Sequence, residues 1–266
     1  DLSFTDNAQF SPGIDGSTGN RNAMKLVNVA YNEKFNWHGS ANSLEDQALE
    51  PVTNPVEMKA EWPNVVERIQ QTERYPKRFG EAFDTANVTK ERVVKAIAQF
   101  ERTLLSFNSK YDKVQRQEAF FTQAELRGQD LYFSEDGDCF HCHGGPLLTD
   151  QEFHNNGLDS IFSDDPGRYE ITGDPLDKGL FKSPTLRNIE LTAPYMHDGR
   201  FSTLREVINH YSNSVTKSKT IDPLMKKADQ GGLQLTEQEK DDLIAFLKTL
   251  TDKEFINNEE HSNPFK

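Results

Sequence analysis

Both cysteines of this 266-residue chain lie in one short stretch, GDCFHCHGG, at residues 137–145. Cys139 and Cys142 are separated by two residues, and His143 follows directly. Two cysteines cannot build a disulfide framework, so packing or a cofactor must stabilise the fold. The pattern fits three kinds of site: a redox dithiol, part of a zinc site, or the attachment point of a c-type haem.

The surrounding sequence favours haem attachment. A thioredoxin-type dithiol requires a βαβ setting, which is not apparent here. Zinc requires four ligands, and the histidines that could join the two cysteines are His141, His143 and His154. However, a histidine directly after the second cysteine does not easily reach the same tetrahedral ion. Haem attachment requires that adjacency, because both thiols add to the porphyrin and the next imidazole binds the iron.

An iron held by one histidine needs a second axial ligand or stays open for chemistry. Residues 192–211, TAPYMHDGRFSTLREVINHY, contain two candidates. Met196 has the ligand chemistry of an electron-transfer haem. Tyr211 lies on the apolar stripe of a helix predicted to begin near Thr203, so it faces the expected cofactor. The same pattern also suits a tyrosine that merely fills the core.

The chain is predicted to be mostly α, with two domains and long irregular loops. Its first 60 residues lack periodicity. Val93, Ile97, Phe100 and Leu104 then mark an amphipathic helix. Capping boxes predict further helices, with Thr122 and Glu125 at one start and Thr236 and Glu239 at another. The polar stretch NSKYDKVQRQE places a boundary near residue 115, giving domains at 1–115 and 116–266.

Composition excludes some functions. Thirty basic and 43 acidic residues give a net charge of −13, which argues against binding nucleic acid. No run of 18 apolar residues is present, so no membrane span is expected. The sequence begins at Asp1 without an initiator methionine or signal peptide, and a processed product is therefore expected. Covalent haem, which is attached outside the cytoplasm, would make the protein exported and periplasmic.

Two long segments resemble the bacterial dihaem cytochrome c peroxidase and MauG (methylamine-utilisation) family. RNAMKLVNVAYNEKFNWHGSANSLEDQALEPVTNPVEM, residues 21–58, is similar to the segment after the family's first haem. SPTLRNIELTAPYMHDGRFSTLREV, residues 183–207, is similar to the segment against its second haem. The resemblance implies two cytochrome c-like domains, a peroxidatic N-terminal haem, an electron-transferring C-terminal haem and a calcium ion between them.

Matched position by position, the resemblance implies a role for further residues. Cys139, Cys142 and His143 would hold the C-terminal haem. Calcium would bind to Asn22 and to the backbone carbonyls of Thr192 and Pro194, oxygen ligands that suit this ion. Trp37 matches a tryptophan near the peroxidatic haem. The distal-pocket positions are matched by Gln47, Pro51 and Glu57, with Glu57 as the acid–base group for peroxide.

The sequence departs from the family pattern at three places. The first CxxCH would lie roughly ten residues before Asp1, so the chain is expected to be a fragment or a one-haem variant. The retained distal residues favour a fragment. Tyr211 stands where the peroxidases have methionine and MauG has tyrosine, which makes Met196 the less favoured ligand. The tryptophan that precedes the second CxxCH in MauG corresponds to Gly137 here.

The expected activity is reduction of hydrogen peroxide with electrons from a cytochrome or another small redox protein. One alternative is MauG-like oxidation of residues in a partner protein. The other is a simple electron-transfer cytochrome c, with one six-coordinate haem and no role for Glu57. A homodimer is a possible assembly.

Overall fold

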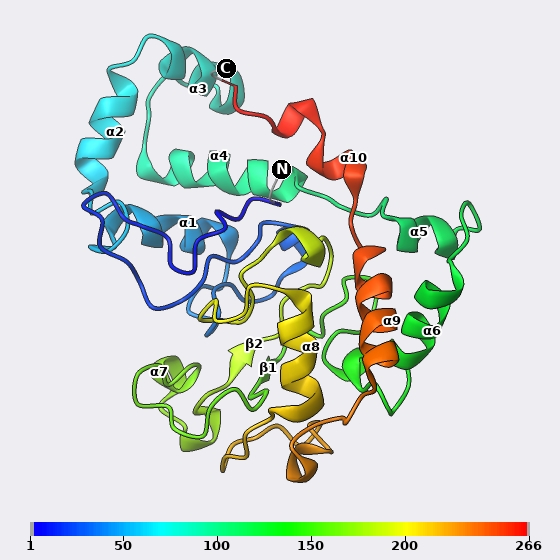
Figure 1. The fold of residues 1–266 in the computed structure, drawn as a ribbon. Helices are drawn as coiled ribbons and strands as arrows, with labels where there is room; N and C mark the ends of the chain where they lie inside the picture. The colour runs from blue at the N-terminus through cyan, green and yellow to red at the C-terminus, as the bar shows by residue number, and fades with distance from the viewer. Residues whose placement is uncertain (1–2, 265–266) are drawn as a thin grey trace.

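The computed structural model describes residues 3–264, so Asp1, on which the expectation of a processed product rests, lies outside them. The described chain is mostly helical, as predicted (Figure 1). Its α-helices are α1 Leu44–Thr53, α2 Trp62–Gln70, α3 Arg74–Phe83, α4 Lys90–Thr103, α5 Lys110–Gln115, α6 Gln123–Tyr132, α7 Tyr169–Thr172, α8 Leu204–Asn213, α9 Glu237–Lys248 and α10 Lys253–Ile256. The two strands, β1 Phe153–His154 and β2 Phe181–Lys182, pair antiparallel.

The predicted capping boxes are confirmed at the starts of α6 and α9. The hydroxyls of Thr122 and Thr236 accept from the backbone of Glu125 and Glu239, and each glutamate carboxylate accepts from its cap's backbone N–H. These reciprocal bonds satisfy amide groups that a helix start otherwise leaves unpaired. Thr203 caps α8 in the same way. None of the described helices is long and apolar enough to cross a membrane.

The largest apolar core lies between α6, α8 and α9. α6 crosses α9 so closely that a Cβ atom on Gly128 would lie 2.0 Å from the carbonyl oxygen of Asp242. The crossing buries Tyr132 of α6 and Phe246 of α9 completely, with ring centroids 5.0 Å apart. These helices form the wall against which the GDCFHCHGG segment is placed.

Residues 22–53 and 182–213 form the same succession of elements twice. In each, an asparagine with left-handed backbone precedes a short 3-10 helix, a β-bridge closes the next loop, and a capped helix follows. The matching pairs are Asn28 and Asn188, Phe35 and Tyr195, Ala41 and Phe201, and the caps Ser43 and Thr203. Helices α1 and α8 are therefore equivalent elements of the two halves.

The two repeats contact each other through reciprocal hydrogen bonds. The backbone N–H of Asn22 donates to the carbonyl of His197 at 2.6 Å, and that of Lys182 donates to the carbonyl of Trp37 at 2.7 Å. Asn22 and Lys182 hold matching positions in the repeats, as do Trp37 and His197. The contact is thus approximately two-fold symmetric, and it brings Trp37 of the first half against the second half.

One predicted apolar stripe is only partly buried. Val93 and Leu104 at the two ends of the α4 stripe are buried, whereas Ile97 and Phe100 between them are 39% and 44% exposed. The predicted amphipathic helix is confirmed, and the middle of its apolar stripe is exposed. The physical reason is that, among the described residues, no helix covers this part of α4.

Helices α4 and α9 hold equivalent places in the two halves. Just after α4, the carbonyl of Leu104 accepts from the backbone N–H of Asn28; just after α9, that of Leu250 accepts from Asn188. Both leucines are completely buried. The two helices differ in what packs against them. Helix α6 covers one face of α9, whereas no helix among the described residues covers the matching face of α4.

Candidate haem site

The cysteine motif forms a compact turn in the loop between α6 and β1. Cys139–His141 is a 3-10 turn, and the backbone N–H groups of Cys142 and His143 both donate to the carbonyl of Cys139. Before it, Gly137 is packed so tightly that a Cβ atom would lie 2.0 Å from the carbonyl oxygen of Leu131. No side chain fits there without backbone movement, so a glycine is required at this position.

Two oxygen atoms lie beside one ring nitrogen of His143. Its Nδ1 lies 3.1 Å from the carbonyl oxygen of Pro184 and 3.3 Å from Oγ of Ser183. If Nδ1–H donates to that carbonyl, the lone pair is on Nε2, the tautomer typical of metal-bound histidine. Burial lowers the pKa of His143 to about 4, so the imidazole is neutral and able to coordinate.

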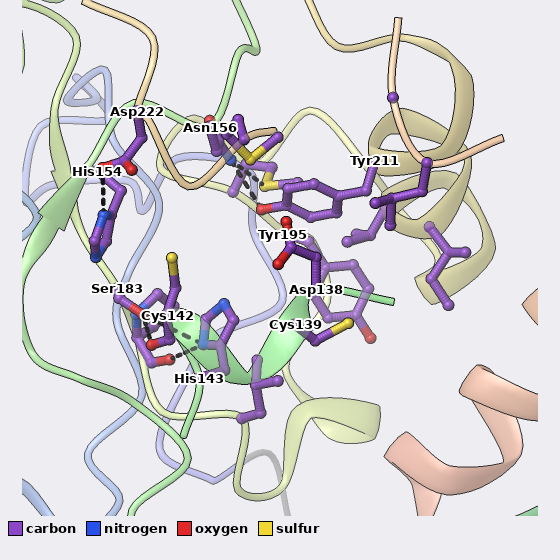
Figure 2. A pocket seen from close by; sticks show the side chains of 18 of the residues that line it. Asp138, Cys139, Cys142, His143, His154, Asn156, Ser183, Tyr195, Tyr211 and Asp222 are labelled. Atoms are coloured by element: carbon purple, nitrogen blue, oxygen red, sulfur yellow. Dashed lines mark hydrogen bonds and ion pairs between the residues drawn. The ribbon is translucent and has the colours of Figure 1, made fainter. Parts of the chain in front are cut away.

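Both cysteines and His143 line a large cavity (Figure 2). The cavity encloses about 1530 Å³ of empty space, part of it open to solvent. Its apolar wall consists mainly of aliphatic side chains: Leu186, Ile189, Leu204, Ile208, Leu243 and Leu247. Cys139 and Cys142 are free thiols. Two free thiols and a neutral imidazole that line a mainly apolar cavity fit a covalently attached haem.

The zinc interpretation gains no such support. Within the part of the chain that is described, Cys142 lies with Asp150 and His154 in one group of potential metal ligands, but neither Cys139 nor His143 belongs to it. His154 instead lies between two carboxylates, with Nδ1 2.6 Å from Asp222 and Nε2 2.7 Å from Asp150. Burial opposes its charge, but these hydrogen bonds raise the pKa of His154 to about 12. Both ring nitrogens of His154 are thus occupied by carboxylates in this structure.

Both candidate axial ligands reach this cavity. Figure 2 shows Tyr211 across the cavity from His143, and Met196 also lines it. Asn156 contacts both, with its amide nitrogen 3.1 Å from Tyr211 Oη and 3.6 Å from Met196 Sδ. Burial raises the pKa of Tyr211 to about 12, and the bond from Asn156 acts in the opposite direction. Asn156 was not identifiable from sequence, since neighbouring asparagines in an irregular loop match no known site pattern.

The predicted distal residues lie together in the first half. Gln47 and Pro51 are one turn apart on α1. The chain then folds back along the end of α1, with the backbone N–H of Met58 donating to the carbonyl of Pro51 at 3.1 Å. This places Glu57 beside that helix end, where Asn54 Nδ2 donates to its Oε1 at 2.6 Å. Trp37, by contrast, lines the haem cavity of the second half.

The predicted calcium residues lie near the contact between the repeats. Asn22 is fixed there by its backbone bond to His197 and by side-chain bonds from Nδ2 to the carbonyls of Ala8 and Gln9, at 2.8 and 3.2 Å. These bonds use the amide N–H groups of Asn22 and leave its Oδ1 for another partner. Among the described residues, the carbonyls of Thr192 and Pro194 accept no hydrogen bond.

Comparisons with known proteins agree with this site. A model of the di-haem cytochrome c peroxidase family matches residues 1–119, and a cytochrome c model matches residues 126–251. Cytochrome c551 peroxidase of Nitrosomonas europaea is 34% identical over 93% of this chain and 70% of its own length. Methylamine utilization protein MauG of Methylophilus methylotrophus is 32% identical over 86% of this chain and 68% of its own length.

A solved structure gives the same result for the fold. A MauG-like protein associated with microbial copper homeostasis superposes with a TM-score of 0.92 at 36% identity, covering all of this chain and 85% of that one. Its likeness extends over both repeats, and the family models together include the CFHCH motif and the predicted distal residues. The chain therefore belongs to the dihaem cytochrome c peroxidase and MauG family of haem c oxidoreductases.

Proposed function

We propose that this protein reduces hydrogen peroxide with electrons from a small redox protein. The observation that carries the proposal is the combination of a haem c cavity in the second half with a group of polar distal residues in the first. A haem bound by Cys139, Cys142 and His143 supplies electron storage and transfer. We assign the two tasks to domains divided near residue 115, a division supported by the separate family matches to residues 1–119 and 126–251.

The internal repeat supports an open iron site in the first half. Pro51 of α1 holds the position that Tyr211 holds in α8. Tyr211 carries a phenol that can bind iron, whereas proline has no donor atom in its side chain. We therefore infer that the haem of the first half has no sixth protein ligand from α1, which leaves room for peroxide.

The exposed face of α4 supports the proposal that a second haem-bearing helix packs against the first half. Ile97 and Phe100 match Leu243 and Phe246 of α9, which are 3% and 0% exposed. Phe246 packs against Tyr132 of α6, and Leu243 lines the haem cavity. Helix α6 is the element that leads into the CFHCH motif. An equivalent helix with its own CxxCH, together with the second expected haem that it would hold, would cover Ile97 and Phe100.

In this proposal Glu57 moves the proton. Its Oε1 accepts from Asn54, and its Oε2 accepts no hydrogen bond among the described residues. That oxygen is available to take a proton from one peroxide oxygen and return it to the other, a general acid–base role. Gln47, on the same helix as Pro51, orients the peroxide through its amide, and Trp37 lines the second cavity.

Calcium is the proposed ion at the contact between the repeats, held by Asn22 Oδ1 and the carbonyls of Thr192 and Pro194. Hard oxygen donors of this kind suit calcium. We expect chelation to remove one calcium ion per chain and to change both the haem absorption spectrum and peroxide turnover. Added calcium should reverse both changes. If chelation altered neither quantity, the assignment of these residues would be wrong.

We further propose that the protein is exported to the periplasm, where haem c is attached. A net charge of −13 suits a partner with a basic surface, such as a small cytochrome. MauG-like oxidation of a protein substrate is the second candidate function, and the tyrosine at position 211 favours it. The simple electron carrier is disfavoured, because it assigns no role to Glu57.

The test of the proposal is a turnover assay on the full-length holoprotein with hydrogen peroxide and a reduced small cytochrome. Peroxide-dependent oxidation of the cytochrome at a catalytic rate is the expected result. Peroxide consumption that occurs only with a protein substrate would favour the second candidate. No peroxide consumption with either reductant would identify the protein as an electron carrier.

A further inference from the structure

Asn156 holds a position between the two candidate ligands of the second haem. Its amide nitrogen lies 3.1 Å from Tyr211 Oη and 3.6 Å from Met196 Sδ (Figure 2 shows the bond to Tyr211). One donor group therefore contacts both side chains that could reach the iron from this wall. Asn156 itself lines the cavity. Its side chain has neither a thiol to attach the haem nor an imidazole to bind the iron.

The loop that carries Asn156 is fixed on both sides. Asn155 is 1% exposed, and its Nδ2 donates to Ser218 Oγ at 2.9 Å and to Thr220 Oγ1 at 3.0 Å. On the other side, Gly157 has φ +71° and packs so that a Cβ atom would lie 2.6 Å from Val215 Cγ1. The backbone around Asn156 is thus set by contacts that do not involve its own side chain.

A further bond ties this loop to the helix of Tyr211. The carbonyl of Asn156 accepts from Nε2 of His210 at 3.0 Å, and His210 directly precedes Tyr211 in α8. The backbone of Asn156 therefore holds α8 while its side chain holds the phenol. Because the two bonds come from different groups, a side-chain substitution at Asn156 removes the second bond and keeps the first.

We propose that Asn156 is a positioning residue, which holds the phenol oxygen of Tyr211 for the iron and keeps the Met196 thioether away from it. The proposal rests on the proposed ligation by Tyr211. An amide N–H bonds strongly to an anionic phenolate oxygen, whereas a thioether sulfur is a weak acceptor. The same donor therefore favours tyrosinate over methionine as the occupant of the ligand position.

The bond also has a defined electronic consequence. A hydrogen bond donated to the phenolate oxygen draws negative charge away from that oxygen. The oxygen then donates less charge to ferric iron. Without that donor, the oxygen should stabilise ferric iron further. Because a hydrogen bond to a charged group is worth roughly a tenfold factor or more, Asn156→Leu should shift the ferric–ferrous equilibrium about tenfold toward ferric.

The experiment is a redox titration of the CFHCH haem in four forms of the full-length holoprotein: unmodified, Asn156→Leu, Tyr211→Phe, and the double variant. We expect the shift in Asn156→Leu and no additional shift from that substitution in the Tyr211→Phe background. A shift of equal size in both backgrounds, or less than a twofold shift in Asn156→Leu, would overturn the proposal. In those cases the proposal that Tyr211 binds the iron would still be supported if Tyr211→Phe by itself changed the haem absorption spectrum.

A spectroscopic measurement on the unmodified protein is independent of whether the variants fold. The iron–tyrosinate vibrational band should shift on transfer to heavy water, because the amide proton of Asn156 exchanges. A band that does not shift would contradict the hydrogen bond, and the absence of any tyrosinate band would contradict both this inference and the ligation on which it rests. If Asn156→Leu gains a methionine-ligated fraction, that fraction should titrate separately at a higher potential and be abolished by Met196→Leu, which would support the selection between ligands directly. The tenfold shift toward ferric iron is expected for the fraction that keeps Tyr211.

Discussion

Replacing Glu57 with glutamine should slow peroxide turnover by about 10²–10⁴-fold, the usual range for the loss of a general acid–base group. The substitution keeps the size of the side chain and an oxygen to accept the bond from Asn54, which now ends on Glu57 Oε1 at 2.6 Å. It removes only the group that can take and return a proton. Steady-state turnover of the full-length enzyme at saturating peroxide measures the effect.

Glu61→Gln is the matched control for this prediction. Glu61 is four residues further on, is exposed, and makes no side-chain capping bond at the start of α2. This control should turn over peroxide at the unmodified rate. Equal peroxide turnover rates for the Glu57 and Glu61 variants would show that Glu57 has no part in the mechanism. That result would favour the interpretation of the protein as an electron carrier.

The second large effect is expected at the iron bound by His143. Tyr211→Phe should open its sixth position or admit another ligand, because phenylalanine has no oxygen to bind. A phenolate is a hard anionic donor that favours ferric iron, whereas a thioether favours ferrous iron and raises the potential. The unmodified haem should therefore have a low potential and lack the weak near-infrared band of histidine–methionine ligation.

Met196→Leu is the comparison that separates the two ligands. It keeps an apolar side chain of similar volume in the cavity and removes the sulfur. Its absorption spectrum should match that of the unmodified protein. If Met196→Leu disturbed the iron and Tyr211→Phe did not, the protein would have the histidine–methionine ligation of the peroxidase branch.

Local features of the fold could be predicted because they depend on short stretches of sequence. Capping boxes at Thr122 and Thr236 involve residues three apart, and the spacing of Cys139, Cys142 and His143 is set by haem chemistry itself. The helical position of Tyr211 follows from periodicity alone, and the residue does line the cavity. The assigned roles of the distal and calcium residues stay predictions.

Features that depend on long-range packing could not be predicted in this way. The exposure of Ile97 and Phe100 depends on whether another helix covers α4, which the periodicity of α4 does not encode. The position of Asn156 depends on a loop held by Ser218 and Thr220, more than 60 residues away. The repeat of residues 22–53 in 182–213 is a signal that the sequence does contain, and it would have predicted the matching of Pro51 with Tyr211.

The most direct test of the central claim, covalent haem at Cys139 and Cys142, is the intact mass of the purified protein under denaturing conditions, combined with a pyridine haemochrome assay. For this 266-residue chain we expect the polypeptide mass plus one haem that denaturation does not release. The full-length product should carry a second haem if the first half has its own CxxCH. A mass equal to the bare polypeptide, or a zinc ion lost on denaturation, would contradict the account.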